Sequence, residues 1–361
     1  MMNENEKQLT LALCDPVAPC PEKIEKLISK GAATSAVLGE LLFNRMGAVA
    51  CKVLCDCGLI QSVNREFRNT LTNTARLNIE YNKSFAAELR SLAAIMAPFT
   101  GKYVFLKGAY LYDLFPPGCR TSNDADILAA PECVTRIGEA LTASGFLQGN
   151  VRNGEFVPAS RSEIINSKMM RGETVPYIKK TDHPFMRFFE VDINFSLGYK
   201  SGDSDTVRDI LESSVLYKDG ETVIPIPCDN DFMLQLCAHL YKEASVYPWI
   251  KMKRDMTLYK YVDIYYLLSK RDMTDAEKLI KRAVALGLQD ACYYAFTSVC
   301  ELFSDKKSGS LRDKIAPFSD CGVILKVISP SDKKLFYYKE ANVKKRFFAR
   351  DRIALLEEAK A

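Results

Sequence analysis

Hydrophobic positions divide the chain into three stretches with different periodicities. In residues 1–98, apolar side chains recur at steps of three and four, as at Leu38, Leu41 and Leu42, which is typical of amphipathic helices. The longest such pattern predicts a helix over residues 70–97, which a proline ends. We therefore expect a helical N-terminal region without catalytic residues.

In residues 99–202, short apolar runs alternate with helical patterns. The runs predict strands at 103–106, 125–129, 175–180 and 188–197, and the helical patterns predict helices at 108–115 and 131–144. Polar residues and three glycines fill 149–174, which we expect to form a long excursion near the site. This order of elements predicts a small mixed α/β sheet.

Helical patterns return in the C-terminal region, residues 203–361. The clearest of them cover residues 231–241, 258–268, 273–287 and 289–303. Together they predict a helical bundle. The expected fold therefore belongs to the α+β class, with a small mixed β-sheet core flanked by N-terminal helices and a C-terminal helical bundle.

Composition narrows the class of protein. Of the 361 residues, 48% are apolar and 26% are charged, a balance that argues against disorder. The formal net charge of +4 permits an anionic ligand without requiring nucleic acid. We expect a cytoplasmic protein, because neither a signal peptide nor a bilayer-spanning stretch is evident. The twelve cysteines lack a zinc-binding spacing and are expected to be reduced thiols.

The most informative stretch joins the first two predicted strands. The first strand ends at Lys107-Gly108, and the second carries Asp124 and Asp126 with one small residue between them. Residues two apart in a strand project from the same face, so the two carboxylates repel each other unless a cation lies between them. Such oxygen ligands suit Mg²⁺, and a glycine lets the backbone approach a phosphate closely. The stretch therefore predicts a metal and nucleoside triphosphate site.

A third carboxylate is expected from the last predicted strand. Residues 188–195 alternate polar and apolar, with Glu190, Asp192 and Asn194 on one face. A solvated edge strand is the alternative explanation of this pattern. If the strand pairs with the one that carries Asp124 and Asp126, three carboxylates converge and can hold two Mg²⁺ ions about 3.5–4 Å apart.

Two metal ions in this position assign a role to each residue. Asp124 and Asp126 are the expected shared ligands, and Asp192 binds the metal of the attacking hydroxyl and accepts its proton. Lys107 and the backbone at Gly108 are expected to bind the β- and γ-phosphates. Arg120 either clamps a phosphate oxygen or is a surface arginine in a loop.

These residues resemble a known family. The runs Leu-Lys-Gly-Ala-Tyr-Leu, Asp124-Ala-Asp126-Ile-Leu and Val-Asp192-Ile-Asn, together with Arg120, are similar to the uncharacterised nucleotidyltransferase family of the polymerase-β-like minimal nucleotidyltransferase superfamily. The resemblance implies transfer of a nucleoside monophosphate from an NTP to an acceptor hydroxyl, with release of pyrophosphate and dependence on Mg²⁺ or Mn²⁺. It also implies leading and trailing helical regions.

The chain departs from the family pattern at three points. The gap from Gly108 to Asp124 is somewhat long, which loosens the expected phosphate geometry. Ala109 stands where the superfamily often has a serine that contacts phosphate, and Asn194 stands where the family often has a histidine. All three carboxylates are present, so we expect activity. The acceptor stays open between a small molecule, an RNA end and a protein side chain.

Other polar residues have less certain roles. His183 is expected in a loop and His239 is expected to be structural in a helix. Participation of Glu190, His183, Asn194 or Lys242 is open. The alternative functions are a catalytically inactive nucleotide-binding regulator and an RNA- or protein-binding adaptor on the same fold, the latter supported only by the net charge and a weakly basic C-terminal tail.

Overall fold

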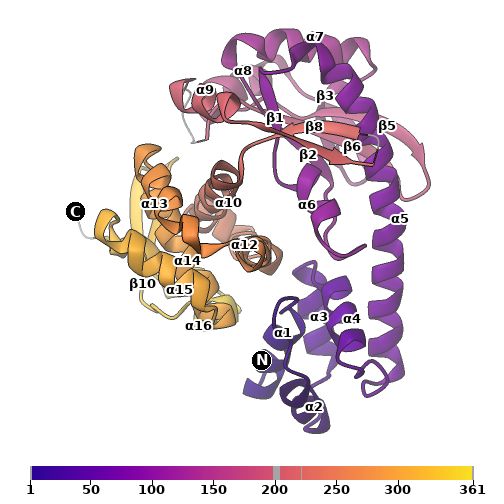
Figure 1. The fold of residues 1–361 in the computed structure, drawn as a ribbon, viewed down its shortest axis with the longest axis vertical. Coiled ribbons are helices and arrows are strands. Elements are labelled where there is room, and N and C mark those ends of the chain that lie inside the picture. Colours follow the sequence, from indigo (N-terminus) through magenta and orange to yellow (C-terminus); the bar gives the residue numbers. More distant parts are fainter. Residues whose placement is uncertain (1, 198–203, 221, 360–361) are drawn as a thin grey trace. The chain divides into compact units, whose positions relative to one another are not determined.

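The computed structural model describes residues 2–197, 204–220 and 222–359 (Figure 1). The chain forms two compact units, which we call the sheet unit and the helical unit. The sheet unit is Arg76–Gln235, and the helical unit combines Met1–Ala75 with Leu236–Ala361. The sequence predicts three regions, residues 1–98, 99–202 and 203–361, and this division into domains stays a prediction.

The secondary structure is mainly helical, with three small sheets, and the α+β class predicted from the sequence is confirmed. The α-helices are α1 (Glu4–Leu13), α2 (Pro21–Ser29), α3 (Ser35–Phe43), α4 (Gly47–Asp56), α5 (Arg65–Met96), α6 (Gly108–Leu114), α7 (Val134–Ala143), α8 (Arg161–Arg171), α9 (Ser204–Glu212), α10 (Asp229–Ala244), α11 (Tyr247–Lys251), α12 (Leu258–Lys270), α13 (Ala276–Ala285), α14 (Gln289–Phe303), α15 (Lys306–Ile315) and α16 (Val343–Phe347). The strands are β1 (Tyr103–Phe105), β2 (Asp124–Ala129), β3 (Leu147–Arg152), β4 (Glu155–Pro158), β5 (Tyr177–His183), β6 (Met186–Asn194), β7 (Val215–Asp219), β8 (Thr222–Ile226), β9 (Lys326–Ser329), β10 (Lys334–Tyr338) and β11 (Leu356–Glu358). No helix in the described part of the chain is long and apolar enough to cross a bilayer.

The sheet unit is built on a six-stranded mixed sheet in the order β1-β2-β6-β5-β3-β4 (Figure 1). The two central strands β2 and β6 run parallel, and every other neighbouring pair is antiparallel. Parallel pairing of β2 and β6 matters for function, because it brings the two acidic strand patterns of the sequence side by side in one register.

One face of this sheet is covered by helices. Phe189, Val191 and Ile193 of β6 are fully buried, and the Phe189 ring lies edge-on against Phe85 of α5, with 5.8 Å between the ring centroids. Helix α7 packs on the same face, since a Cβ at Gly138 would overlap the hydroxyl of Tyr177, the strand partner of Val191. Because side chains alternate along a strand, the acidic residues of β2 and β6 point to the opposite face.

A two-stranded hairpin, β7–β8, fastens helix α6 within the sheet unit. The hydroxyl of Tyr112 donates a hydrogen bond to Asp219, and that of Tyr217 donates one to Asp113. Ile224 and Ile226 of β8 add to the core of the sheet unit. These contacts hold α6, and with it the Lys107-Gly108 turn at its start, in a defined position.

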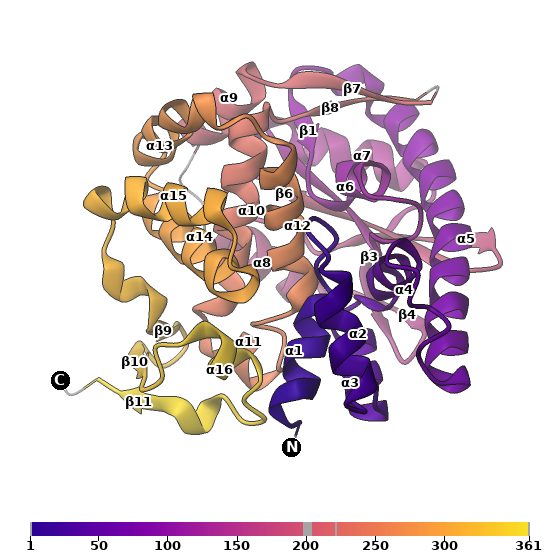
Figure 2. The same cartoon turned by 60° about the horizontal axis from the view of Figure 1, so that its bottom comes forward.

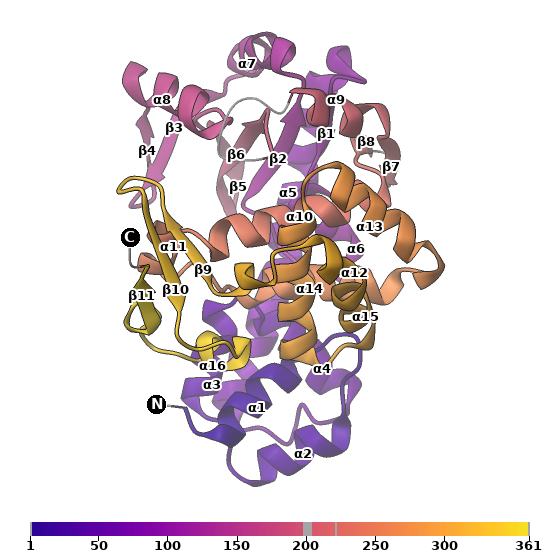
Figure 3. The ribbon, with the colours of Figure 1, turned by 90° about the vertical axis from the view of Figure 1, so that its left-hand side faces the viewer.

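The helical unit contains the paired helices α14 and α15 (Figure 2) and a three-stranded sheet in the order β11-β10-β9 (Figure 3). Its interior holds charged groups. Arg352 donates two 2.7 Å hydrogen bonds to the fully buried carboxylate of Asp255. Arg346 is also fully buried, and its guanidinium lies 4.7 Å from the centre of the Tyr338 ring.

Two segments differ from the sequence-based expectation. The expected excursion 149–174 contains strand β4, most of strand β3 and helix α8 (Figure 3). The C-terminal region, expected to be a helical bundle, also contains strands β7 to β11. The turn between β3 and β4 explains why part of the excursion forms a hairpin, because Asn153 and Gly154 both have positive φ, of 51° and 77°. Asn-Gly favours that turn in an antiparallel hairpin even when the flanking strands are polar.

Candidate functional site

The parallel register of β2 and β6 assembles the three carboxylates. Asp126 is paired directly with Asp192, and Asp124 is paired with Glu190. Asp124, Asp126 and Asp192 each offer an oxygen atom, and these atoms lie within 4.8 Å of one another. Among the described residues, this is the one group of three or more acidic, histidine or cysteine side chains close enough to share a metal ion.

The fold holds these three carboxylates close together although their negative charges repel one another. Ala125 and Ile127 alternate with the aspartates along β2 and are fully buried, so packing of the core fixes which face the aspartates occupy. Burial first, and the negative charges of Asp124 and Asp126 second, raise the pKa of Asp192 well above its ordinary value. The site therefore holds negative charge that a cation would stabilise.

Burial raises the pKa of Asp126 as well, and the neighbouring charge of Asp124 adds to that effect while Lys107 opposes it. The pKa of Glu190 is raised by burial and by Asp124. Carboxylate oxygens in this number and proximity fit a hard divalent cation such as Mg²⁺.

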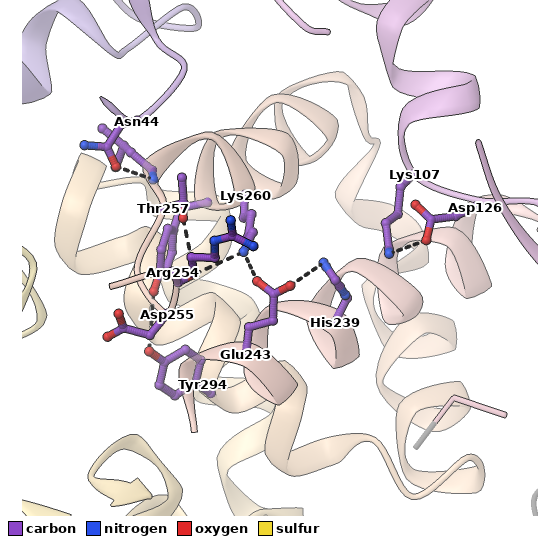
Figure 4. Close-up of polar contacts among 12 residues, drawn as sticks. Asn44, Lys107, Asp126, His239, Glu243, Arg254, Asp255, Thr257, Lys260 and Tyr294 are labelled. Carbon is purple, nitrogen blue, oxygen red and sulfur yellow. Dashed lines mark hydrogen bonds and ion pairs between the residues drawn. The ribbon is translucent and has the colours of Figure 1, made fainter. Parts of the chain in front are cut away.

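Lys107 supplies the nearest positive charge. Its Nζ lies 2.7 Å from Oδ1 of Asp126, and only 17% of the lysine side chain is exposed (Figure 4). Burial alone would lower the pKa of Lys107, but the carboxylates of Asp126, Asp124 and Asp192 outweigh it and raise that pKa. The backbone of Lys107 has a positive φ of 42°, which is uncommon for a residue with a side chain. Its ammonium thus offsets part of the effect of burial on the pKa of Asp126.

Gly108 is constrained by Ser122. A Cβ at position 108 would overlap the Oγ and Cβ atoms of Ser122, so no larger residue fits there without a shift. Ser122 is buried, and its Oγ lies 3.0 Å from both the backbone oxygen and Oδ1 of Asp124. The glycine therefore allows the turn at Lys107 and the loop before Asp124 to pack against each other. Its binding to phosphate stays a prediction.

Arg120 is 7% exposed and therefore is not a surface arginine. Its guanidinium donates a hydrogen bond to the carbonyl of Thr121, and Asn82 of α5 donates a 2.9 Å hydrogen bond to the carbonyl of Arg120. These contacts hold the loop that leads to Asp124. A contact of Arg120 with phosphate stays a prediction.

The structure corrects the position expected for His183. This residue ends strand β5 and does not lie in a loop, and its Nε2 is 3.3 Å from Oε1 of Glu88 on α5. Lys179 contacts the other oxygen of Glu88 at 2.6 Å. Both side chains therefore lie on the helix-covered face of the sheet, opposite the carboxylates.

The sequence left the roles of Asn194 and Lys242 open and predicted His239 to be structural in a helix. Asn194 points its amide toward the carbonyl of Ile127, 3.5 Å away. Lys242 and His239 belong to the part of α10 in the helical unit. There the Nε2 atom of His239 lies 3.4 Å from Glu243, which also pairs with Lys260 (Figure 4).

Sequence reasoning missed two polar residues near the carboxylates. Ser122 is adjacent in sequence to the aspartate strand, but nothing in its pattern indicates a bond to Asp124. Glu173 lies on the segment between α8 and β5 and forms a single antiparallel bridge with Asn194. Its charge contributes to the raised pKa of both Asp126 and Asp192. A lone glutamate in a polar segment gives no sequence signal of this position.

Comparison with known proteins agrees with this geometry. The family profile described as "Uncharacterised nucleotidyltransferase" matches residues 35–304, which include both strands of the acidic site. No curated protein matches the chain significantly. The match covers well over half of the sequence. The chain therefore belongs to this family of uncharacterised nucleotidyltransferases.

Proposed function

We propose that this nucleotidyltransferase moves a nucleoside monophosphate from an NTP to an acceptor hydroxyl and releases pyrophosphate, with Mg²⁺ or Mn²⁺ bound at Asp124, Asp126 and Asp192. The observation that carries the proposal is the convergence of these three carboxylates, within 4.8 Å, in a chain of this family. The acceptor is a small molecule, an RNA end or a protein side chain.

The three aspartates have different positions in the proposed reaction. Asp124 and Asp126 follow each other on one strand and would hold the cations jointly, whereas Asp192 approaches from the neighbouring strand. Bound divalent cations supply charge neutralisation for the triphosphate and lower the pKa of the acceptor hydroxyl. Asp192 orients that hydroxyl and accepts its proton.

Lys107, Gly108 and Arg120 are proposed to bind the triphosphate. Lys107 pairs with Asp126 in this structure, and this contact uses only one of the three donors of its ammonium group. A cation bound to Asp126 would replace the lysine charge there and release it. Nucleotide and cation are therefore expected to bind cooperatively.

The position of the radioactive label tests the reaction class. The protein is incubated with Mg²⁺ and each NTP carrying ³²P at either the α- or the γ-phosphate, and with separate fractions of RNA, protein and small metabolites as acceptors. Nucleotidyl transfer moves the α label to one fraction and releases the γ label in pyrophosphate. Transfer of the γ label would indicate a kinase and contradict the proposal.

Two variants link the label transfer to the site. Asp126→Asn keeps the shape of the side chain but removes the charge, and we expect a loss of at least 100-fold in transfer, comparable to other losses of transition-state electrostatics. Glu139→Gln changes an exposed carboxylate on α7 and serves as the matched control, with transfer unchanged. Equal activity of Asp126→Asn and the control would exclude these carboxylates as the metal site.

A further inference from the structure

We propose that the helical unit contains a second ligand site, a pocket between helices α1, α14 and α16 that binds a small organic anion with an aromatic or aliphatic body. The residues that line the pocket include none of Asp124, Asp126 and Asp192, and neither the family match nor the sequence pattern assigns it a role. This site is therefore independent of the nucleotidyl transfer proposed above. The size, the apolar wall and the charge of the pocket each favour such a ligand.

The pocket has the size of a small-molecule site. Its volume is about 510 Å³, within the roughly 300–1,000 Å³ of natural ligand pockets. The wall consists of residues from α1 and α2, the C-terminal end of α14, and the segment 342–348 around α16. All of these segments belong to the helical unit, in which α1 and α16 lie beside each other (Figure 2).

Contacts between the helices fix the wall of the pocket. Val343 N, at the start of α16, donates a 2.8 Å hydrogen bond to the carboxylate of Glu301 on α14. On the other side, Nζ of Lys7 on α1 lies 6.0 Å from the centre of the Phe348 ring, close enough for a cation–π contact. The pocket therefore exists in the folded helical unit without a ligand.

One part of the wall is apolar. Phe348 is half-buried, and Phe347 packs edge-on against its ring, with 4.8 Å between the ring centroids. Phe303 is also half-buried and stacks on Tyr265, with the centroids 4.7 Å apart. Leu11 of α1 adds an aliphatic side chain to this wall. Because both rings are held by neighbours and remain partly exposed, they offer an ordered surface to an aromatic or aliphatic body.

Lysine side chains surround this apolar wall. Four lysines line the pocket, namely Lys7, Lys23, Lys344 and Lys345. Lys345 is paired with Glu340 at 3.3 Å, and Lys7 lies 3.9 Å from Glu4. The ammonium groups of Lys23 and Lys344 form no ion pair or hydrogen bond with any residue that the structure describes. These two groups are therefore available to an anionic ligand.

The charge of the pocket fits one anionic group. Four lysines and the three carboxylates of Glu4, Asp15 and Glu340 give a formal charge of +1. Asp15 is occupied locally, because its carboxylate accepts hydrogen bonds of 3.0 and 2.9 Å from the backbone N–H groups of Val17 and Ala18. A single carboxylate, sulfonate or phosphate ester would balance this charge, whereas a nucleoside triphosphate would exceed it.

Two fluorescent probes with the same aromatic body test this site. Anilinonaphthalene sulfonate carries an anionic group, and phenylnaphthylamine lacks it. Each probe is titrated into the full-length protein in EDTA. We expect Lys344→Glu to weaken binding of the sulfonate by about tenfold or more, because the anion loses a cation and meets a like charge. Binding of the uncharged probe should not change in this variant, and Phe348→Ala should weaken binding of both probes.

Matched controls separate the pocket from the rest of the surface. Lys281→Glu makes the same charge change at an exposed lysine of α13, and Phe318→Ala removes a ring that is 55% exposed outside the pocket. Both variants should bind the two probes like the wild type. Circular dichroism establishes that each variant is folded.

Two results would overturn the proposal. One is that the wild type does not bind the sulfonate probe, or that it binds the probe no more tightly than Lys344→Glu does. The other is that Asp124→Asn/Asp126→Asn abolishes probe binding, since the probe would then occupy the aspartate site. Neither result bears on metal-dependent nucleotide binding, which is measured separately with NTP and Mg²⁺.

Discussion

At the scale of single residues, the site depends on a close approach between Gly108 and Ser122. Replacing Gly108 with alanine would place a methyl group on the side chain of Ser122. We expect Gly108→Ala to lower the free energy of unfolding by about 1–3 kcal/mol, as overpacking of a filled interior does. Urea denaturation measures the change.

The matched control for this substitution is Gly39→Ala. Gly39 is an exposed helical glycine with open space around its Cα, so alanine there should be neutral or stabilising by about 0.5–1 kcal/mol. The double variant Gly108→Ala/Ser122→Gly should recover part of the lost stability. No loss in the single variant would show that the Gly108–Ser122 contact is not tight.

The acidic site should also make stability depend on pH. The pKa of Asp192 is raised above its ordinary 3.8, so the folded protein holds this proton in a pH range where the unfolded chain has released it. Stability of the metal-free protein should therefore fall as pH rises from about 4 through the raised pKa. Melting temperatures in EDTA across this range measure the slope.

Asp192→Asn removes the titrating group, so we expect a shallower slope for this variant and a higher melting temperature than the wild type at neutral pH. Added Mg²⁺ should restore wild-type stability at neutral pH, because it binds the ionised carboxylates. If the melting temperatures of the wild type and Asp192→Asn depend on pH to the same extent, ionisation of the buried Asp192 does not destabilise the metal-free protein.

The sequence predicted the three aspartates but not the residues that support them. Asp124, Asp126 and Asp192 stand in strands whose alternation is visible in the sequence, and parallel pairing alone brings them together. Ser122 and Glu173 depend on how two irregular segments turn. The conformation of those segments depends on tertiary packing, which cannot be predicted from the periodicity of apolar residues.

At the scale of secondary-structure elements, hairpin β7–β8 holds the helix that follows Lys107. Tyr112 is buried and donates to the Asp219 carboxylate, so Tyr112→Phe should cost about 1.5–3 kcal/mol of unfolding free energy, as hydrogen bonds to charged groups do. The Tyr217–Asp113 bond is exposed, and Tyr217→Phe should cost less than about 1 kcal/mol.

Chemical denaturation of the two variants, which lose the same atom, compares them directly. If Tyr217→Phe lowers the free energy of unfolding more than Tyr112→Phe does, the buried Tyr112–Asp219 hydrogen bond is not the one that mainly holds α6 in place. The Tyr112 variant should also weaken nucleotide binding, because α6 begins at the predicted phosphate-binding turn.

Long periodic elements were predicted well, and short polar strands were not. Helix α14 has the bounds expected from its apolar pattern, and α12 differs by two residues at its end. Hairpin β3–β4 carries Asn153-Gly154 at its turn, a hairpin signal that was present in the sequence. Strands β3 and β4 lack the apolar alternation that makes a strand evident by periodicity.

At the scale of the whole molecule, a buried ion pair fastens the C-terminal segment within the helical unit. Arg352 donates two hydrogen bonds to the carboxylate of Asp255 away from solvent. We expect Arg352→Ala to cost about 3–5 kcal/mol of unfolding free energy, because it leaves Asp255 buried without its cation. Arg352→Lys should recover only part, since lysine lacks the two-pronged geometry.

Lys334 provides the control, because its pair with Glu358 is half exposed at the surface of the three-stranded sheet. Lys334→Ala should change stability by less than about 1 kcal/mol. Thermal unfolding of both variants measures the difference. Equal effects would contradict a structural role of the buried pair.

The same region bears on the adaptor alternative. The sequence run Lys344-Lys345-Arg346 is the densest basic point of the C-terminal tail, yet Arg346 is fully buried and donates a 2.6 Å hydrogen bond to the carbonyl of Ile324. One of the three charges is therefore used inside the fold. The basic tail gives correspondingly less support to binding of nucleic acid through this segment.

The central claim is that the three aspartates form a metal-dependent nucleotide site, and calorimetry tests it most directly. Each NTP is titrated with and without Mg²⁺ into the wild type, the double variant Asp124→Asn/Asp126→Asn and the control Glu139→Gln. We expect the wild type and control to bind at least one NTP only with Mg²⁺, and the double variant to lose that binding. Binding that ignores Mg²⁺ or survives in the double variant, or no binding of any NTP, would contradict the claim.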